Sequence, residues 1–255
     1  MNEFNRRRIS LVASQILLGA VILSLWEWGS SAKVLDPFVF SRPSLIAVRV
    51  FHLVFSGLIW HHLAITFLEA SLSFVIGGML GVLGGFVLAR SPKIASILEP
   101  FLRVGNALPR VVLAPIFLLW FGLGIWSKVA LGVSVVFFVV FYNTFRGLRE
   151  VDRVMIDNAR MLGATERQLL RHVLAPSALT WIFSSLHVAV GLAIIAVIVG
   201  EYLGSSAGIG YLIAQAEGVF DSTGVFAGMT ILAIGVLAVG SAVDAVERRL
   251  TRWKP

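Results

Sequence analysis

The side chains best suited to chemistry in this sequence stand in a polar segment between two apolar stretches, Arg146 to Pro176, which reads RGLREVDRVMIDNARMLGATERQLLRHVLAP. The chemistry they suggest is binding, because the chain has no serine–histidine or paired-carboxylate arrangement that would support catalysis. The sequence on either side is compatible with lipid. The segment must therefore face water, and we expect it to hold a partner there.

Residue spacing predicts a helix in the first half of this segment. An apolar stripe at i, i+4, i+8 and i+11 consists of Val151, Met155, Ala159 and Leu162. Gly163 follows at a C′ position, where a left-handed backbone costs little in glycine. The first helix is therefore expected to end at this glycine.

A second short helix is predicted after the glycine. Thr165 is an N-cap residue, and Gln168 three residues later completes a capping box. The apolar run Leu169 to Val173 follows, and Pro176 suits the first turn of the next span. Three arginines seven residues apart share one face: Arg153, Arg160 and Arg167. The segment is thus predicted to be two capped helices with an apolar seam and a basic flank.

Two interpretations of this segment stay open on physical grounds. It could lie flat as a surface hairpin whose arginines pair with anionic lipid head groups. It could also dock a cytoplasmic protein, which explains the capped turn and the apolar residues that extend into water.

The composition places the chain in the membrane-protein class. Its 255 residues are 58% hydrophobic and 14% charged, with a mean hydropathy of +0.90, whereas soluble domains carry about 25% charged residues. The net charge of +7 comes without interleaved aromatic and basic residues, so no nucleic-acid partner is expected. The absence of cysteine excludes disulfides and thiolate sites, and the scattered histidines predict no metal site.

We expect an all-α polytopic fold with about six transmembrane helices, because a membrane helix needs about 20 mainly apolar residues. The windows free of Asp, Glu, Lys and Arg are Ile9–Trp26, Ala70–Ala89, Val111–Ser127, Val129–Phe145, His172–Gly200 and Ser222–Val243. The first follows Arg6–Arg8 like a signal peptide, but its length and poor cleavage site favour an uncleaved span. Pro109 and Pro115 are expected to bend the start of the third span, which forms a tight hairpin with the fourth.

The distribution of Lys and Arg predicts the orientation. With six spans both termini share one side, and that side holds sixteen of the 21 basic residues, against four on the other: Lys33, Arg42, Arg49 and Lys128. By the positive-inside rule, both termini, the 146–176 loop and a basic tail at 246–255 are cytoplasmic.

Residues 41–60 fall on the outer side and carry apolar side chains at helical spacing: Leu45, Val48, Phe51, Phe55 and Ile59. They could form an amphipathic helix on the membrane surface or a docking face for an external partner. In the second span, Gly77, Gly81 and Gly85 predict close helix packing within the chain rather than a dimer face.

Three residues in or near spans are candidates for a translocation pathway. Arg110 adjoins the Pro109 kink and could face an anionic substrate or snorkel to head groups. Glu201 ends the fifth span and could contact a gate or form a structural pair. Trp120 lies near the external end of its span, where it could line the pathway or belong to the aromatic belt.

The loop resembles the EAA loop of the integral membrane subunits of bacterial ABC importers, whose pattern is E-A-A-x3-G-x9-I-x-L-P. The matching positions are Asp157, Asn158, Ala159, Gly163, Val173, Ala175 and Pro176. The spacing fits throughout, with Asp for Glu, Asn for Ala, Val for Ile and Ala for Leu. The resemblance implies a coupling helix seated in an ATPase groove, with the contact residues Asp157, Asn158, Ala159, Arg160, Gly163, Ala164, Thr165 and Pro176.

Two further stretches, PRVVLAPIFLLWFGLGIWSK (Pro109–Lys128) and VGEYLGSSAGIGYLI (Val199–Ile213), are similar to the subfamily that imports nitrate, taurine, aliphatic sulfonates and related compounds. This implies an N-terminal helix with an outer segment at 1–60 and an ABC transmembrane type-1 domain at 61–245. It also implies a lipid-embedded homodimer in the bacterial inner membrane, two cytoplasmic ATPase subunits and a periplasmic or extracellular solute-binding protein.

The chain has no phosphate-binding loop of the G-x4-G-K-[S/T] type. We therefore expect no cofactor and no enzyme activity in this chain, with ATP and Mg on the partner ATPase. The expected role is translocation of a small anionic solute such as a sulfonate, taurine or nitrate. The alternative is a secondary transporter or channel that works without an ATPase. It predicts intramembrane carboxylates, of which Glu69 and Glu201 lie near spans.

Overall fold

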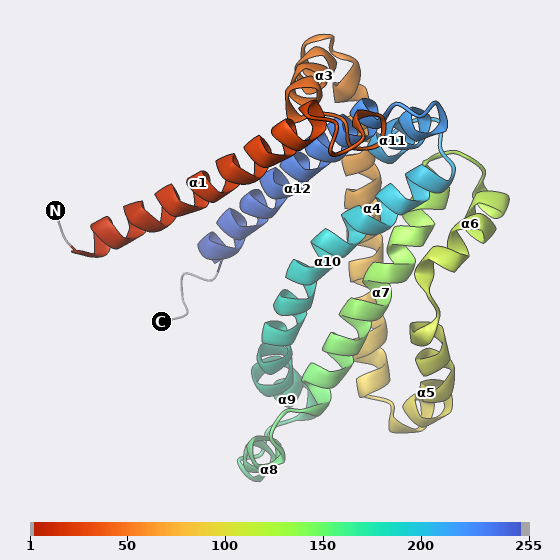
Figure 1. Ribbon diagram of the computed structural model, residues 1–255. Helices are drawn as coiled ribbons and strands as arrows, with labels where there is room; N and C mark the ends of the chain where they lie inside the picture. Colours follow the sequence, from red (N-terminus) through yellow and green to blue (C-terminus); the bar gives the residue numbers. More distant parts are fainter. Residues whose placement is uncertain (1–2, 251–255) are drawn as a thin grey trace. The chain divides into compact units, whose positions relative to one another are not determined.

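The computed structural model describes residues 3–250, with side chains described at 10–152, 154–243 and 245. All regular structure among these residues is helical, which confirms the predicted all-α fold (Figure 1). The elements are α1 Glu3–Ser31, α2 Pro37–Phe40, α3 Pro43–Phe55, α4 Leu58–Ala89, α5 Pro92–Ala107, a 3-10 turn Arg110–Leu113, α6 Ala114–Phe121, α7 Ile125–Arg149, α8 Arg153–Met161, α9 Glu166–Leu169, a π turn Leu170–Leu174, α10 Ala175–Leu203, α11 Ile209–Gly218 and α12 Ser222–Leu250. The side chains of the predicted basic tail at 246–255 lie outside this description.

Six helical segments among the described residues are long and apolar enough to cross a membrane, or seven if one bent pair counts as a span. They are Ser10–Ser31, Pro37–Phe55, Leu58–Ala89, Ile125–Arg149, Glu166–Leu203 and Ser222–Val243. All but Pro37–Phe55 coincide with predicted spans. That segment contains α2 and α3 and falls in the predicted outer region. The apolar stripe predicted there ends at Phe55, because Ile59 belongs to α4 and is buried.

The third predicted span, Val111–Ser127, is wrong as a continuous helix. It contains most of a 3-10 turn, Arg110–Leu113, and the eight residues of α6, which ends at Phe121, whereas α7 begins at Ile125. Gly122 has φ 72°, a conformation that glycine adopts readily and that ends the helix.

A separate 90° bend precedes this span, between α5 and the 3-10 turn. The cause is Pro109, because the residue before a proline is disfavoured in helical conformation. Leu108 is accordingly extended, with φ −65° and ψ 129°. The bend expected at this proline is a complete break.

The chain forms two compact units. The first contains the residues up to Trp60 together with Leu212–Ala233, and the second contains His61–Tyr211 together with the residues from Ile234 onward. α11 and α12 each contribute to both units. The predicted coupling-loop and pathway residues all belong to the second unit, whereas the outer segment 41–60 belongs to the first.

Contacts between distant parts of the sequence hold the first unit together. The hydroxyl groups of Ser41 and Thr223 lie 2.7 Å apart, so they form a hydrogen bond. The guanidinium of Arg49 pairs with the carboxylate of Asp221 at 2.5 Å. Both contacts join the α2–α3 region to the beginning of α12.

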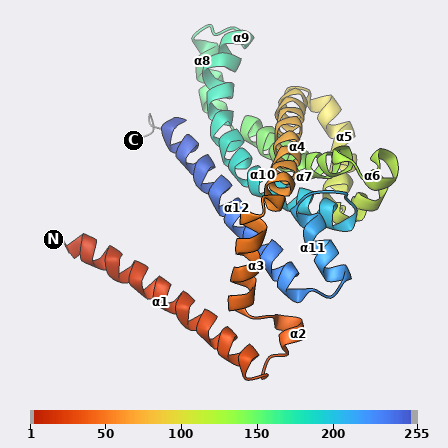
Figure 2. The same cartoon turned by 90° about the horizontal axis from the view of Figure 1, so that it is seen from above.

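In the second unit α4, α7 and α10 pack on one another as a three-helix bundle (Figures 1 and 2). Val136 and Val140 of α7 are buried against Ala189 and Ala193 of α10, with Phe74 of α4 beside them. Small side chains at such contacts allow helix backbones to approach closely. The alanines of α10 therefore permit the tight α7–α10 contact.

Three glycines give α4 a flat face against α7: Gly77, Gly81 and Gly85. A Cβ added at Gly81 would lie 2.8 Å from the Cβ of Val140 and 2.9 Å from the carbonyl oxygen of Phe137. These separations are shorter than van der Waals contact, so glycine is required for this approach. The predicted packing of these glycines within the chain is confirmed.

We predict that Gly81→Ala destabilises the second unit by about 1–3 kcal/mol, the usual cost of overpacking a well-packed contact. The measurement is the thermal denaturation midpoint of the purified protein in detergent. Gly191→Ala on α10 is the matched control, because a Cβ there meets no atom within 4 Å and alanine favours a helix. A Gly81→Ala protein that melts no lower than the control contradicts this account of the packing.

Candidate functional site

The loop between α7 and α10 contains two capped helices, as predicted. The carboxylate of Asp152, which the sequence analysis did not select, caps α8 by accepting from the Val154 N–H at 2.9 Å. At the other end Gly163 has φ 81°. Its N–H donates to the Arg160 carbonyl at 2.9 Å, and the next N–H donates to the Ala159 carbonyl at 3.0 Å. This pair of bonds is a Schellman motif, which satisfies carbonyls that the helix end would leave unpaired.

The capping box predicted at the start of α9 is confirmed. The Thr165 N–H donates to the side chain of Gln168 at 2.9 Å, and the Gln168 N–H donates to the Thr165 hydroxyl at 3.3 Å. Across the turn, the guanidinium of Arg160 pairs with the Glu166 carboxylate at 3.1 Å. The turn between α8 and α9 is therefore held by backbone and side-chain contacts on both sides.

The tip of this loop exposes apolar side chains. Met161 and Leu162 are 85% and 89% exposed, so the predicted apolar stripe is buried at Val151 and open at its other end. Side chains at the turn border a hollow of about 280 Å³, which is lined by Ala159, Leu162, Gly163, Ala164, Gln168, Leu169, His172 and Val173. Asp157, Asn158 and Thr165 are exposed, while Ala159 and Ala164 are half-buried. Exposed apolar residues of this kind are typical of a contact with a partner.

A π turn joins α9 to α10 without interrupting the helical path. The Ala175 N–H donates to the Leu170 carbonyl, five residues back. Pro176, in the first turn of α10, has no N–H, and its ring would clash with the carbonyl four residues before it. The wider turn accommodates this proline. The segment Glu166–Leu203 is therefore one helical path of 38 residues.

At the other end of that path lies a buried polar cluster, which consists of the side chains His62, Thr66, Glu69, Lys128 and Glu201. Four polar residues of α4 recur at intervals of four, three and four: His62, Thr66, Glu69 and Ser73. That spacing places them on one face of the helix. The sequence analysis noted Glu69 as a carboxylate near a span but missed this stripe, although its period was visible in the sequence.

Glu201, a predicted pathway residue, is the centre of the polar cluster. It is 1% exposed, and its carboxylate accepts from the Thr66 hydroxyl and the Gly210 N–H, each at 2.7 Å. The Thr66 oxygen in turn accepts from the Ile209 N–H at 2.9 Å. A carboxylate at the start of a helix is favoured by the N–H groups there. Glu201 and Thr66 together therefore fix the beginning of α11.

His62 continues this attachment. Its Nδ1 accepts from the Gly208 N–H at 3.0 Å, and its ring stacks on Tyr211 with a centroid separation of 6.0 Å. Gly208 has φ 110°, a conformation that glycine adopts readily, and a Cβ there would collide with the Glu201 carboxylate. Three consecutive N–H groups of the 208–210 segment are thus bound by the polar cluster.

Lys128 supplies the positive charge of the polar cluster. The sequence analysis placed it in a loop between spans, but it lies in the first turn of α7 and is 1% exposed. Its ammonium donates to the carbonyls of Leu123 and Gly124 at 2.6 and 2.8 Å and lies within electrostatic range of Glu69 and Glu201. The cost of burying the ammonium is offset by the two carbonyls that accept from it and by long-range attraction to these acidic groups.

The other two predicted pathway residues have separate surroundings. The guanidinium of Arg110 donates to the Gly105 carbonyl and lies over the Phe138 ring, 4.3 Å from its centroid. Trp120 is 67% exposed on α6, with its ring edge toward Phe117. Among the described residues, no hydrogen bond, ion pair or ring contact joins Arg110, Trp120 and Glu201. Among the side chains that the structure describes, no group of three or more His, Asp or Glu is arranged to hold a metal ion.

Comparison with known proteins identifies the family. The family of binding-protein-dependent transport system inner membrane components matches residues 77–252. A formylaminopyrimidine transport permease of Halalkalibacterium halodurans is 35% identical over 92% of this chain and 93% of its own length. The riboflavin transport system permease of Chloroflexus aurantiacus is 32% identical over 92% and 87%. The taurine transport system permease of Escherichia coli is 26% identical over the same shares.

Solved structures agree on the fold. The inward-facing methionine ABC transporter MetNI aligns with a TM-score of 0.59 and 21% identity, over 75% of this chain and 93% of that one. A crystal structure of an amino acid ABC transporter with histidines aligns with a TM-score of 0.59 and 18% identity, over 77% and 97%. The chain therefore belongs to the family of binding-protein-dependent transport system inner membrane components, as a multi-pass ABC importer permease that leaves ATP hydrolysis to a separate subunit.

Proposed function

We propose that this permease carries a small anionic solute, delivered by a separate binding protein, and is driven by an ATPase that binds at residues 146–176. The observation that carries the proposal is the helical path Glu166–Leu203, with the exposed α8–α9 tip at one end and Glu201 at the other. At about 1.5 Å per residue it is about 57 Å long. A hydrocarbon core is about 30 Å thick, so the path can link the two sides of the membrane.

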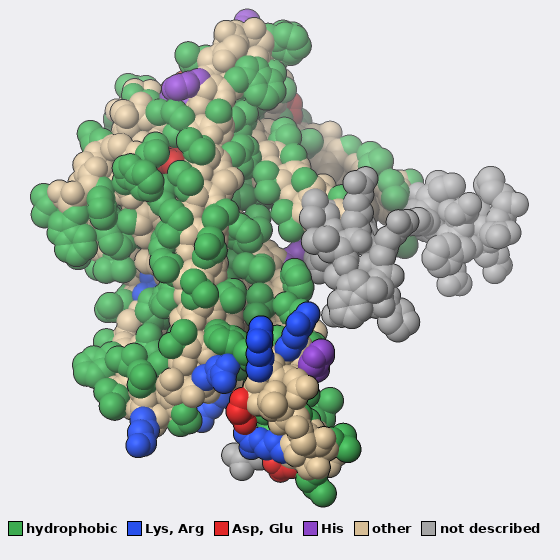
Figure 3. All heavy atoms as spheres, turned by 180° about the vertical axis from the view of Figure 1, so that it is seen from behind, with side chains coloured by type: hydrophobic (Ala, Val, Ile, Leu, Met, Phe, Trp, Pro, Cys, Tyr) green, Lys and Arg blue, Asp and Glu red, His purple; other side chains and the backbone are tan. Residues whose placement is uncertain are grey.

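The α8–α9 tip is the proposed ATPase contact, through Asp157 to Arg160, Gly163 to Thr165 and Pro176. Exposed Met161 and Leu162 supply apolar area for a groove in the partner. Lys and Arg side chains gather at this end of the second unit, while the surface away from it is mostly hydrophobic (Figure 3). Such a gathering favours a cytoplasmic location for the tip. ATP and Mg belong, in this proposal, to the partner ATPase.

The Schellman motif and the capping box make the tip a lever rather than a loose loop. A displacement imposed on α8–α9 is passed through the π turn into α10, because the helical hydrogen bonding is continuous. At the far end, Glu201 holds Thr66 of α4 and Gly210 of α11. Tilting of α10 therefore acts on the start of α11. We assign this polar cluster to the side that receives the solute-binding protein.

The remaining parts of the proposal concern the assembly and the pathway. A second copy of this chain is expected to complete the permease, with two ATPase subunits beneath it. Arg110, Trp120 and Glu201 are kept as pathway residues, with Arg110 as the charge that selects an anion. The taurine permease among the relatives supports a solute with a sulfonate head group, whereas the formylaminopyrimidine and riboflavin permeases are named for other solutes.

We predict that Gly163→Pro uncouples the ATPase. Proline cannot reach φ 81° and lacks the N–H that bonds to Arg160. The measurement is solute-stimulated ATP hydrolysis and uptake by the full complex in liposomes. A coupling free energy between sites is typically about 1–3 kcal/mol, or about 5- to 150-fold, so we expect a loss of at least about fivefold in both activities.

Gly163→Asn is the matched control, because asparagine tolerates the left-handed conformation and keeps the N–H. It should retain most of the stimulation, and both variants should still be inserted in the membrane. If the Gly163→Pro complex hydrolyses ATP and takes up solute as well as the unaltered complex, the lever proposal is wrong.

We also predict that Thr66→Val impairs transport through the polar cluster. Valine keeps the shape but removes the hydroxyl that donates to Glu201 and accepts from Ile209. An unpaired buried N–H costs about 1–3 kcal/mol, so the thermal midpoint should fall and uptake should decrease. Thr230→Val is the control, because its exposed hydroxyl bonds only within its own helix. If the two variants melt and transport alike, the polar cluster has no role in coupling.

A further inference from the structure

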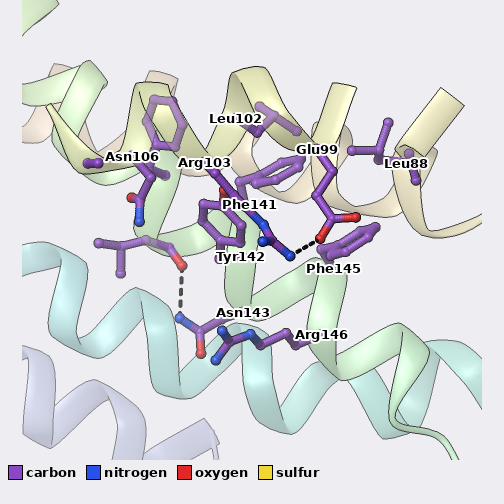
Figure 4. A pocket seen from close by; sticks show the side chains of 14 residues that line it. Leu88, Glu99, Leu102, Arg103, Asn106, Phe141, Tyr142, Asn143, Phe145 and Arg146 are labelled. Atoms are coloured by element: carbon purple, nitrogen blue, oxygen red, sulfur yellow. Dashed lines mark hydrogen bonds and ion pairs between the residues drawn. The ribbon is translucent and has the colours of Figure 1, made fainter. Parts of the chain in front are cut away.

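A second hollow lies between α5 and α7, away from every residue of the polar cluster. It has a volume of about 580 Å³ and opens between the two helices (Figure 4). Its lining is Leu88, Ala95, Glu99, Leu102, Arg103, Asn106, Ala107, Phe138, Val139, Phe141, Tyr142, Asn143, Phe145 and Arg146. Ligand pockets in proteins typically span about 300–1,000 Å³, so this one has the size for a small organic molecule.

Aromatic rings of α7 form one wall of this pocket. Phe141 and Phe145 stack with centroids 5.9 Å apart and planes inclined by 7°. Phe138 lies one turn before Phe141 and carries the guanidinium of Arg110 on its face. Leu88 and Leu102 extend the apolar surface from α4 and α5. An apolar or aromatic body would therefore be favoured inside the pocket.

The polar groups of the pocket favour a negative charge. The guanidinium of Arg103 is paired with Glu99 at 2.6 Å, whereas the exposed side chain of Arg146 forms no ion pair or hydrogen bond with another described residue. Arg103, Arg110 and Arg146 all lie within electrostatic range of the Tyr142 hydroxyl. With one carboxylate, Glu99, against two guanidinium groups, Arg103 and Arg146, in its lining, the pocket carries an excess of positive charge.

The Tyr142 hydroxyl is itself unpartnered. It is buried and has no hydrogen-bond partner among the described residues. Figure 4 shows Tyr142 between the side chains of α5 and the rest of α7, near Arg103. Buried hydroxyl groups normally find a partner, so this one is a donor available to a bound molecule. An acidic oxygen placed beside it would also meet a guanidinium.

Resting on the function proposed above, we propose that this pocket binds an organic anion of solute size during its passage through the permease. Arg146 and the Tyr142 hydroxyl hold the acidic head, and the rings of Phe138, Phe141 and Phe145 contact its apolar body. The ligand class is a sulfonate or carboxylate with an apolar or aromatic substituent. Arginine suits this task because its planar fork matches two oxygens of such a head group.

The test uses the full chain, purified in phosphatidylcholine nanodiscs without ATPase. Benzenesulfonate is the probe, neutral benzyl alcohol is its uncharged counterpart, and binding is followed by saturation-transfer NMR titration. Loss of one charge-assisted hydrogen bond weakens binding by about tenfold. We expect this loss in Arg146→Gln and a smaller loss in Tyr142→Phe. Lys93→Gln is the matched control, because Lys93 is an exposed cation of α5 that does not line the pocket.

The outcomes separate this proposal from its alternatives. The site is supported if benzenesulfonate binding weakens in Arg146→Gln and Tyr142→Phe but not in Lys93→Gln, and if benzyl alcohol binding is the same in all three variants. Binding unchanged in both pocket variants overturns it. A parallel arm adds phosphatidylglycerol and measures retained lipid by native mass spectrometry. If lipid retention, and not benzenesulfonate binding, depends on Arg146, the occupant is a lipid head group and the solute site is wrong.

The thermal midpoint of each variant verifies that it is folded. Because no ATPase is present, failure here leaves the coupling proposal intact, and failure of the Gly163 test leaves this site intact.

Discussion

The hydrogen bonds that the Glu201 carboxylate accepts hold the end of α10, the face of α4 and the start of α11 together. A lipid environment offers no water to polar groups, so each must find its partner inside the protein. This constraint explains the types of the residues that surround the Glu201 carboxylate. Gly208 and Gly210 leave room for the carboxylate, and the polar stripe of α4 supplies its donor. Lys128 supplies the opposing charge.

The same constraint gives α10 its two different ends. One end is anchored in the buried polar cluster, and the other passes through a π turn into helices that face outward. Between them, Ala189 and Ala193 let α10 lie close to α7, while glycines do the same for α4 on α7. Helices that contact one another through small residues pack closely, so they have little room to shift relative to one another. A force on one end of α10 is therefore transmitted along it rather than absorbed by side chains.

How far the sequence predicted this arrangement depended on the separation between interacting residues. Gly163 and the Thr165–Gln168 box were predicted, because a cap involves residues within one turn. The polar cluster was not, because Thr66 and Glu201 are 135 positions apart and hydrophobicity windows contain no pairing information. The period of the α4 stripe would have indicated a shared face, though not its partner. The third span was wrong because a charge-free window ignores turn residues such as Gly122, whose φ of 72° ends α6.

Two prolines in this chain have opposite mechanical consequences, and their positions explain why. Pro109 follows a residue driven into extended conformation, so α5 and α6 are separated by a 90° bend. Pro176 lies in the first turn of a helix, and the π turn before it, in which the Ala175 N–H donates to the Leu170 carbonyl, gives its ring room. The bend at Pro109 separates α5 from α6, whereas the π turn before Pro176 keeps α9 and α10 in one helical path. In the lever mechanism proposed above, movement of the α8–α9 tip therefore acts on α10 directly, and through Glu201 on the start of α11.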